Sequence, residues 1–182
     1  TISFIISANN NIPRIKGIIE RMARRYGNKI EWKGNEYYTF PTPEQLSKAS
    51  VEDLRALGLG FRDKRIYDTT KLVISKQIDL EKLKQETDSK KIKETLLTLP
   101  GVGPKVADCI MLFSTLKCLD VFPVDVWVRR VMNELYFKPP LSFFSMEVLC
   151  NKFSCNKKEI CDEHISVQIL MTSNDLLKLL LV

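Results

Sequence analysis

The sequence predicts an all-α fold, a bundle of roughly eight short helices. Apolar residues recur at spacings of three and four in successive segments, which is the period of one helix face. Capping residues precede many of these segments, and glycine or proline follows them. No stretch shows strong strand alternation, and 45% of the residues are hydrophobic, enough for an ordinary globular core.

The first half of the chain predicts a series of short helices. Residues 1–8 are apolar and predict a core helix, and a second helix opens at Pro13 and ends at Gly27. Residues 29–40 predict an irregular segment or a short hairpin. Further helices are expected to begin near Glu44, after the capping residue Ser50, at Arg62 and near Asp79.

Two glycine turns separate these helices. Leu57-Gly-Leu-Gly60 holds two residues that are free to adopt positive φ. In Leu99-Pro-Gly-Val-Gly-Pro-Lys105, Pro100 and Gly101 end a helix predicted over residues 88–98. Gly103 permits a second tight bend, and Pro104 suits the first position of a helix expected to reach about Leu116.

This helix, glycine hairpin and helix can bind an anion. Backbone N–H groups at the start of a helix lack partners within it, and they favour a phosphate. The residues that would contact the phosphate are Gly101, Val102 and Gly103.

Lys105 and Asp125 can carry chemistry. Lys105 falls in the first turn of the second helix, where the helix dipole and partial burial disfavour the ammonium form, and a neutral lysine amine can form a Schiff base. Asp125 precedes an apolar-periodic stretch that runs to about Tyr136, so its carboxylate is expected to cap that helix. The alternative is a solvated surface lysine and a simple cap.

The charge is unevenly distributed. The chain carries a formal net charge of +6 at pH 7. Residues 139–182 contain four lysines and five acidic residues, a net −1, so residues 1–138 carry +7. A basic body suits a polyanionic partner, although modest basicity alone does not establish one.

The cysteines and the apolar runs exclude other classes. The five cysteines, at positions 109, 118, 150, 155 and 161, are an odd number and do not form the disulfide framework of a secreted domain. No secretory leader and no membrane-spanning apolar run is present. We therefore expect a soluble, intracellular protein without a membrane partner.

Four motifs together resemble a known family. LPGVGPKVADCI (99–110) and VFPVDVW (121–127), with NNNIPRI (9–15) and LGLGFR (57–62), are similar to the helix-hairpin-helix (HhH-GPD) DNA glycosylases, and most similar to the 8-oxoguanine DNA glycosylase/lyases. The resemblance covers about residues 1–137. It implies a helical glycosylase domain over 1–138, with the hairpin at 97–105, and a divergent segment, partly helical or poorly ordered, over 139–182.

The resemblance implies base excision repair. The enzyme would flip 8-oxoguanine out of duplex DNA, and Lys105 would attack the sugar C1′ and form a Schiff base that permits β-elimination. Asp125 would stabilise the positive charge on the sugar. Cys109, one turn after Lys105, would form one wall of the base pocket, or it is a small buried core residue.

The resemblance also assigns DNA contacts. Phe61 would be the wedge between bases, Arg62 and Arg14 would hold the cytosine left behind, and Asn9 would fill the vacated space. Core packing of Phe61 and simple capping by the asparagines are the alternatives. Trp127 would donate its indole N–H to a backbone phosphate, or it is a half-buried core aromatic.

The implied partner is double-stranded DNA that holds 8-oxoguanine opposite cytosine or an abasic site, bound by a monomer located with the DNA. No cofactor is required, although the carbonyls of Leu97, Leu99 and Val102 would hold a monovalent or divalent cation. An iron–sulfur cluster is not expected, because Cys150, Cys155 and Cys161 offer three ligands at the wrong spacing.

The resemblance is incomplete. The family's N-terminal sheet domain has no counterpart in this sequence, and the aromatic and glutamine that read the oxidised base cannot be placed. Competing interpretations are a non-enzymatic helix-hairpin-helix DNA-binding module, which needs neither Lys105 nor Asp125, and a fragment with lyase activity only. A glycosylase/lyase for oxidised pyrimidines is also possible, but the absent cluster cysteines and the matches at Asn9–Arg14 and Phe61-Arg62 argue against it.

Overall fold

The computed structural model describes residues 1–118, 120–135, 140 and 142. It contains two compact units. The first comprises Thr1–Gln85 and Glu94–Val102, and the second comprises Glu86–Lys93 and the residues from Gly103 onward.

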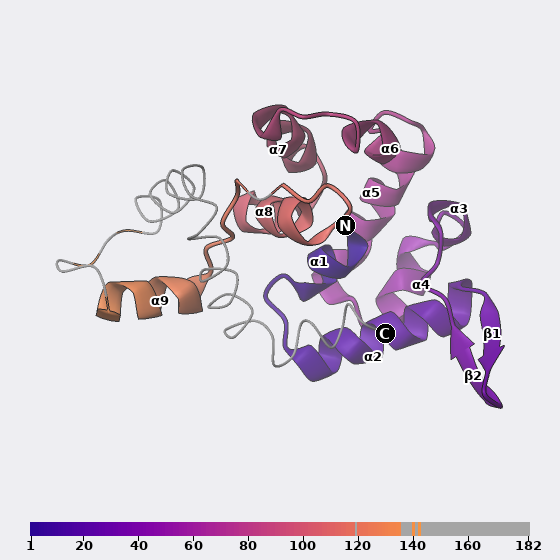
Figure 1. Cartoon of the computed structure of the whole chain (residues 1–182). Coiled ribbons are helices and arrows are strands. Elements are labelled where there is room, and N and C mark those ends of the chain that lie inside the picture. Colours follow the sequence, from indigo (N-terminus) through magenta and orange to yellow (C-terminus); the bar gives the residue numbers. More distant parts are fainter. Residues whose placement is uncertain (119, 136–139, 141, 143–182) are drawn as a thin grey trace. The chain divides into compact units, whose positions relative to one another are not determined.

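The described residues confirm the predicted all-α class, with one small β-ribbon added (Figure 1). No helix among them is long and apolar enough to cross a membrane. The elements, in chain order, are α1 (Ile2–Ser7), α2 (Ile12–Tyr26), β1 (Lys29–Trp32), β2 (Asn35–Tyr38), α3 (Pro43–Leu46), α4 (Val51–Ala56), the 3-10 turn η1 (Gly60–Arg62), α5 (Asp63–Ile74), α6 (Leu80–Leu83), α7 (Ser89–Leu97), α8 (Pro104–Phe113) and α9 (Val126–Leu135).

Side-chain caps fix the starts of the helices in the first unit. Asn11 accepts a hydrogen bond from the Arg14 amide at the start of α2, and Pro13 follows in the first turn as predicted. Reciprocal capping boxes begin α3 at Thr42 and α4 at Ser50. The local sequence therefore determines where these helices begin.

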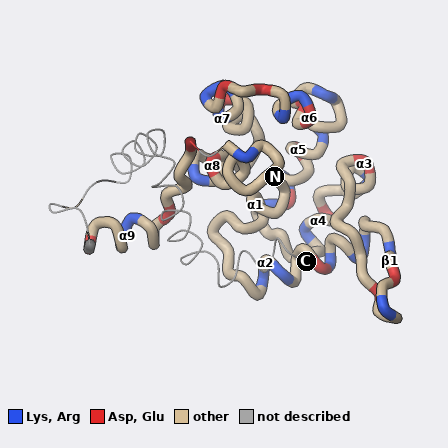
Figure 2. Tube along the Cα trace, in the orientation of Figure 1, with Lys and Arg blue, Asp and Glu red and all other residues tan. Residues whose placement is uncertain are grey.

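The core of the first unit lies where α1, α2, α4 and α5 contact one another. Its fully buried side chains include Ile5, Ile6, Ile18, Met22, Leu54, Leu59 and Ile66. On its solvent side α2 carries basic residues, which Figure 2 marks in blue along the helix. The basic residues of α2 are Arg14, Lys16, Arg21, Arg24 and Arg25, against a single acid, Glu20.

The segment from 29 to 40 forms a hairpin, one of the two predicted alternatives. β1 pairs antiparallel with β2, with Lys29 opposite Tyr38 and Trp32 opposite Asn35. Lys33 and Gly34 both have positive φ (52° and 74°), the turn geometry that matches the twist of a two-residue hairpin.

In the second unit, α8 is buried over the six consecutive residues Val106–Met111, whereas α9 buries Val128. Val124 and Val128 form a small buried cluster with Phe122 and Met132 packed against it. The prediction that α8 continues to about Leu116 is wrong, because the helix ends at Phe113. Ser114 leaves the helical region (φ −95°, ψ −170°), and its hydroxyl accepts a hydrogen bond from the Leu116 amide.

Candidate active site

The glycine hairpin between α7 and α8 depends on one left-handed residue. The amide of Val102 donates to the carbonyl of Leu99 at 3.0 Å, and Gly101 has φ +85°. A Cβ at Gly101 would lie 2.8 Å from Cδ of Arg65, so only glycine fits here. The second tight bend expected at Gly103 is absent, since that residue is extended (φ −95°, ψ 180°).

The start of α8 offers free donors for an anion. Gly103 is the N-cap and supplies no side-chain hydrogen bond, and Pro104 follows in the first turn as predicted. The first backbone bond of the helix runs from the Ala107 amide to the Gly103 carbonyl at 2.9 Å. The preceding N–H groups therefore remain available at the positive end of the helix dipole.

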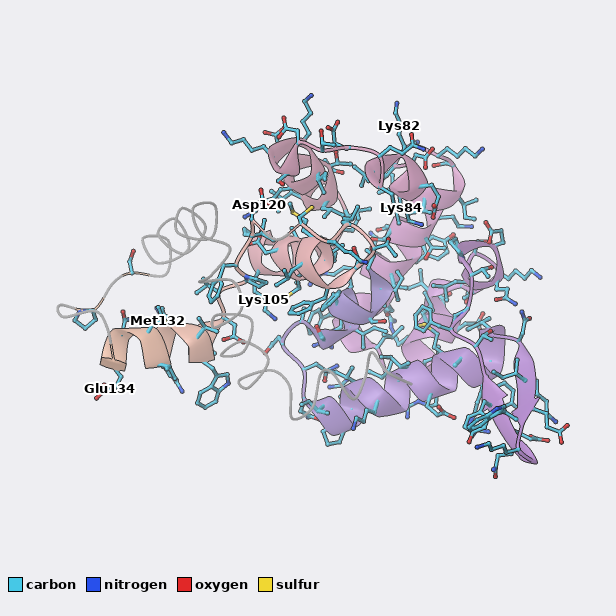
Figure 3. All side chains as sticks on the ribbon, in the orientation of Figure 1. Lys82, Lys84, Lys105, Asp120, Met132 and Glu134 are labelled. Carbon is cyan, nitrogen blue, oxygen red and sulfur yellow. The ribbon has the colours of Figure 1, made fainter. Side chains whose placement is uncertain are left out.

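Lys105 lies in the first turn of α8 and is half-buried (Figure 3). Cys109 follows one turn later with its side chain buried, and Lys105 hydrogen-bonds to its thiol. Burial raises the pKa of the Cys109 thiol, whereas the charge and hydrogen bond of Lys105 act to lower it. The predicted spacing thus brings the amine and the thiol into contact.

Asp125 caps α9, as predicted. Its Oδ1 accepts hydrogen bonds from the backbone amides of Trp127 and Val128, both at 2.9 Å. The charge of this carboxylate also acts, as the smallest of several causes, to raise the pKa of the Cys109 thiol. Lys105, Cys109 and Asp125 all belong to the second unit. The cap fixes the carboxylate in place and does not exclude a catalytic use.

Sequence reasoning missed a charged pair beside this group. Asp108 has no exposed surface, and the Lys93 Nζ of α7 lies 2.9 Å from its Oδ1. The sequence did contain a signal, an acidic residue inside the apolar run Val106–Met111, where a carboxylate needs a partner.

The turn that carries Phe61 is held by arginines. Arg21 donates to the Leu57 carbonyl from Nε (3.0 Å) and Nη2 (2.8 Å), and Arg14 donates to the Gly58 carbonyl at 3.0 Å. Gly58 and Gly60 have the predicted positive φ (89° and 58°). A Cβ at Gly58 would lie 3.0 Å from Nη2 of Arg21, which explains a glycine here.

Phe61 projects from this turn with 55% of its surface exposed, so the core-packing alternative is wrong. Arg62, by contrast, is buried. It donates to the carbonyls of Ala8 and Asn9 and more weakly to that of Leu59 (3.3 Å). Burial and the nearby cations Arg14 and Arg65 lower the pKa of its guanidinium. Its contact with a base stays a prediction, since backbone carbonyls occupy the guanidinium here.

Only one of the three asparagines caps a helix. Asn11 caps α2, and Asn10 donates to the Ile6 carbonyl at 3.0 Å. Asn9 is exposed in the left-handed region (φ 50°), and its side chain makes no hydrogen bond to the part of the chain that the structure describes. Asn9 is therefore presented to solvent, and capping explains only its neighbours.

Trp127 and the carbonyls proposed to bind a cation are the remaining expected site groups. Trp127 is 62% exposed beneath the Arg130 guanidinium, which lies 4.9 Å from the ring centroid, so it is no half-buried core residue. Of the three proposed cation-binding carbonyls, those of Leu97, Leu99 and Val102, the second already accepts a backbone hydrogen bond. The described residues hold no cluster of three or more metal-ligating side chains, and Cys150, Cys155 and Cys161 lie outside them.

Comparison with known proteins agrees with the motifs. Residues 2–142 match the sequence profile described as HhH-GPD superfamily base excision DNA repair protein. A "Probable N-glycosylase/DNA lyase" of Methanothermobacter thermautotrophicus is 36% identical over 154 residues, which cover 74% of this chain and 48% of the relative. The "N-glycosylase/DNA lyase" of Saccharomyces cerevisiae is also 36% identical, over 74% of this chain and 39% of its own length.

A solved structure extends the likeness to three dimensions. The 8-oxoguanine glycosylase/lyase of Clostridium acetobutylicum, in complex with double-stranded DNA containing cytosine opposite 8-oxoguanine, is 41% identical with a TM-score of 0.77. The match covers 82% of this chain and 51% of that one. The chain spans less than half the length of the two curated relatives. The resemblance drawn from the four motifs is confirmed.

Proposed function

Because the chain belongs to the HhH-GPD superfamily of base excision DNA repair proteins, we propose that it removes 8-oxoguanine from duplex DNA and then cleaves the strand. One observation carries the proposal. The half-buried Lys105 at the start of α8 hydrogen-bonds to Cys109, and the charge of the capped carboxylate of Asp125 acts on the same thiol. A lysine nucleophile beside a fixed carboxylate suits a bifunctional glycosylase and lyase.

The damaged base must first leave the stack, at a cost of a few kcal/mol. The hairpin Gly101–Gly103, with the free amides at the start of α8, would hold a backbone phosphate, and the exposed indole of Trp127 would donate to another. Phe61 would enter the helix as a wedge. The cytosine left behind would be held by Arg14 and Arg62, and Asn9 would fill the vacated space. Arg62 would first release part of its backbone contacts.

The amine of Lys105, after loss of its ammonium proton, then attacks C1′. The glycosidic bond breaks, and the base departs with its electron pair and takes up one of the two protons that the attacking amine loses. The sugar O4′–C1′ bond then opens, O4′ takes up the other amine proton, and an imine is left on Lys105. Loss of a C2′ proton expels the 3′ phosphate, and water finally releases Lys105 from the imine. The Asp125 carboxylate stabilises the positive charge that develops on the sugar.

The proposal extends to the partner and to a bound ion. The relative from Clostridium acetobutylicum binds DNA with cytosine opposite 8-oxoguanine, which supports the same substrate here, with abasic sites as a second one. This chain would act as a monomer wherever the cell keeps its DNA. The carbonyls of Leu97, Leu99 and Val102 would hold a cation at the hairpin, and no other cofactor is needed.

Borohydride trapping tests the proposal with two duplexes, one with 8-oxoguanine opposite cytosine and one with an abasic site. We expect covalent complexes with both, lost in Lys105→Gln and kept in the surface control Lys82→Gln. Trapping with the abasic duplex alone would reduce the function to a lyase. No trapping with either, despite DNA binding, would overturn the enzyme and favour a bare DNA-binding module.

A further inference from the structure

We propose that the buried ion pair between Asp108 and Lys93 is a positioning device for Lys105, which it holds against Cys109. The inference rests on the proposed function for its catalytic meaning, because it concerns the nucleophile of that reaction. The geometry on which it stands lies wholly within the second unit. The pair joins the first turns of α7 to the middle of α8.

The location of Asp108 is unusual for a carboxylate. Its side chain has no exposed surface, and its neighbours along α8, such as Ala107 and Ile110, are buried apolar residues. A charge in such a place is strongly disfavoured unless a counter-charge meets it. Lys93 supplies that counter-charge at 2.9 Å, with 24% of its own side chain exposed.

Stability alone does not account for such a pair. The cost of removing both charges from water offsets most of their attraction, and apolar residues of similar size often stabilise a fold as well or better. What the ion pair adds, and apolar residues cannot replace, is a fixed orientation of α8 relative to the first turns of α7. Hydrophobic contacts around Val106, Ala107 and Met111 tolerate small rotations of α8, whereas the attraction between two charges weakens as they separate, most steeply in a buried site of low dielectric.

The orientation of α8 also sets the position of Lys105, because Asp108 and Lys105 lie on the same helix. Lys105, Asp108 and Cys109 stand at positions i, i+3 and i+4 of α8, so they share adjoining turns of one rigid element. A rotation or slide of α8 that releases Asp108 from Lys93 therefore also carries Lys105 relative to Asp125. A displacement of about 1 Å at a reacting group can cost about a hundredfold in rate.

A titration that needs no activity provides the sharpest test. The Asp108 charge acts to raise the pKa of the Cys109 thiol, while Lys105 acts to lower it. In Asp108→Asn, loss of the charge alone would make Cys109 more acidic. Displacement of Lys105 would make it less acidic. We expect a less acidic Cys109. The measurement is the ¹³Cβ chemical shift of labelled cysteine as a function of pH, and the Cys109 resonance is the one that is absent in Cys109→Ala.

A kinetic test completes the experiment on a duplex with a preformed abasic site. Asp108→Leu/Lys93→Met removes both charges and keeps the side-chain bulk. We expect it to fold, to bind a non-cleavable abasic analogue within twofold of wild type, and to perform single-turnover β-elimination about ten- to a hundredfold more slowly. Lys93→Arg should retain most of the rate. The exposed pair of α6, changed in Glu81→Gln/Lys84→Met, is the matched control.

The outcomes separate this inference from the proposed function. A more acidic Cys109 in Asp108→Asn, or a folded double variant at the wild-type rate, would overturn the positioning role. If the double variant does not fold, two measurements still test the positioning role. One is the titration of Cys109 in Asp108→Asn, and the other is the β-elimination rate of Lys93→Gln, which we expect to fall several-fold. If the wild-type protein does not cleave, the proposed function fails, and the titration alone tests the ion pair.

Discussion

The guanidinium of Arg62 donates to the carbonyl oxygen of Ala8 from two nitrogens, Nε at 2.9 Å and Nη2 at 2.6 Å. This contact joins segments 54 positions apart in the sequence. Asn9 follows directly on one segment, and Phe61 precedes Arg62 on the other. The side chains proposed to fill the vacated space and to wedge the bases apart are therefore held by a single buried cation.

Removal of Arg62 should destabilise the protein, because Arg62→Met leaves several carbonyls without their charged donor. We expect a loss of about 2–4 kcal/mol in the free energy of unfolding, measured by urea denaturation. Arg65→Met is the control, since Arg65 is exposed near the same Phe61 ring. Equal stability of the two variants would show that the backbone contacts of Arg62 contribute little.

Phe61→Ala should separate base extrusion from chemistry. The ring is exposed, so we expect the free energy of unfolding to change by less than about 1 kcal/mol. Excision of 8-oxoguanine from a paired duplex should slow at least about tenfold, because the wedge no longer offsets the cost of unstacking. β-Elimination at an abasic site should persist, and Phe61→Trp should retain excision. A comparable loss on both duplexes would contradict the wedge role.

The two hairpin glycines should respond differently to alanine. Gly101→Ala imposes a side chain at φ +85° and 2.8 Å from Arg65, and we expect a loss of about 1–3 kcal/mol together with weaker DNA binding. Gly103 is extended, and a Cβ added there would meet no atom within 4 Å, so Gly103→Ala should unfold at the wild-type urea concentration. A stable Gly101→Ala would contradict the need for a left-handed glycine at the hairpin.

The pH dependence of stability should include a contribution from Cys109. Its pKa is raised in the folded state, chiefly by burial, so the unfolded chain releases the thiol proton first as pH rises. The stabilisation is full below the ordinary thiol pKa of about 8.5 and is lost as pH rises towards the folded value. Cys109→Ala should flatten the decline of the unfolding free energy above about pH 8.

The pKa of the Cys109 thiol also depends on Lys105. Since Lys105 acts to lower the pKa of Cys109, Lys105→Gln should raise that pKa further and steepen the alkaline loss of stability. Denaturant titrations at a series of pH values measure both effects. A Lys105→Gln profile identical to wild type would mean that the amine and the thiol are not in contact.

The sequence was most informative where a local rule decides the structure. Ser50 and Asp125 were recognisable as caps from their positions before apolar-periodic stretches, and the structure confirms both. Capping by the asparagine cluster was one of two alternatives, and Asn11 fulfils it. The one-turn spacing of Lys105 and Cys109 follows from helix geometry alone. These features need only a few neighbouring residues.

Contacts between distant segments were not predictable in the same way. The carbonyls of Ala8 and Asn9, which accept from Arg62, lie more than fifty positions away, and the Leu57 carbonyl, which accepts from Arg21, belongs to a turn whose path depends on the packed core. Lys93 lies fifteen positions from Asp108, with the hairpin between them. The early end of α8 depends on the conformation of Ser114, for which helix propensity alone gives no sign.

Lys105 is the nucleophile on which the proposed mechanism depends, and peptide mapping of the borohydride-trapped complex tests this most directly. After nuclease and protease digestion, mass spectrometry locates the residue that carries the reduced sugar adduct. We expect the adduct on Lys105, within the peptide that spans the start of α8. An adduct on the terminal amine of Thr1 or on another lysine, with Lys105 unmodified, would contradict the mechanism.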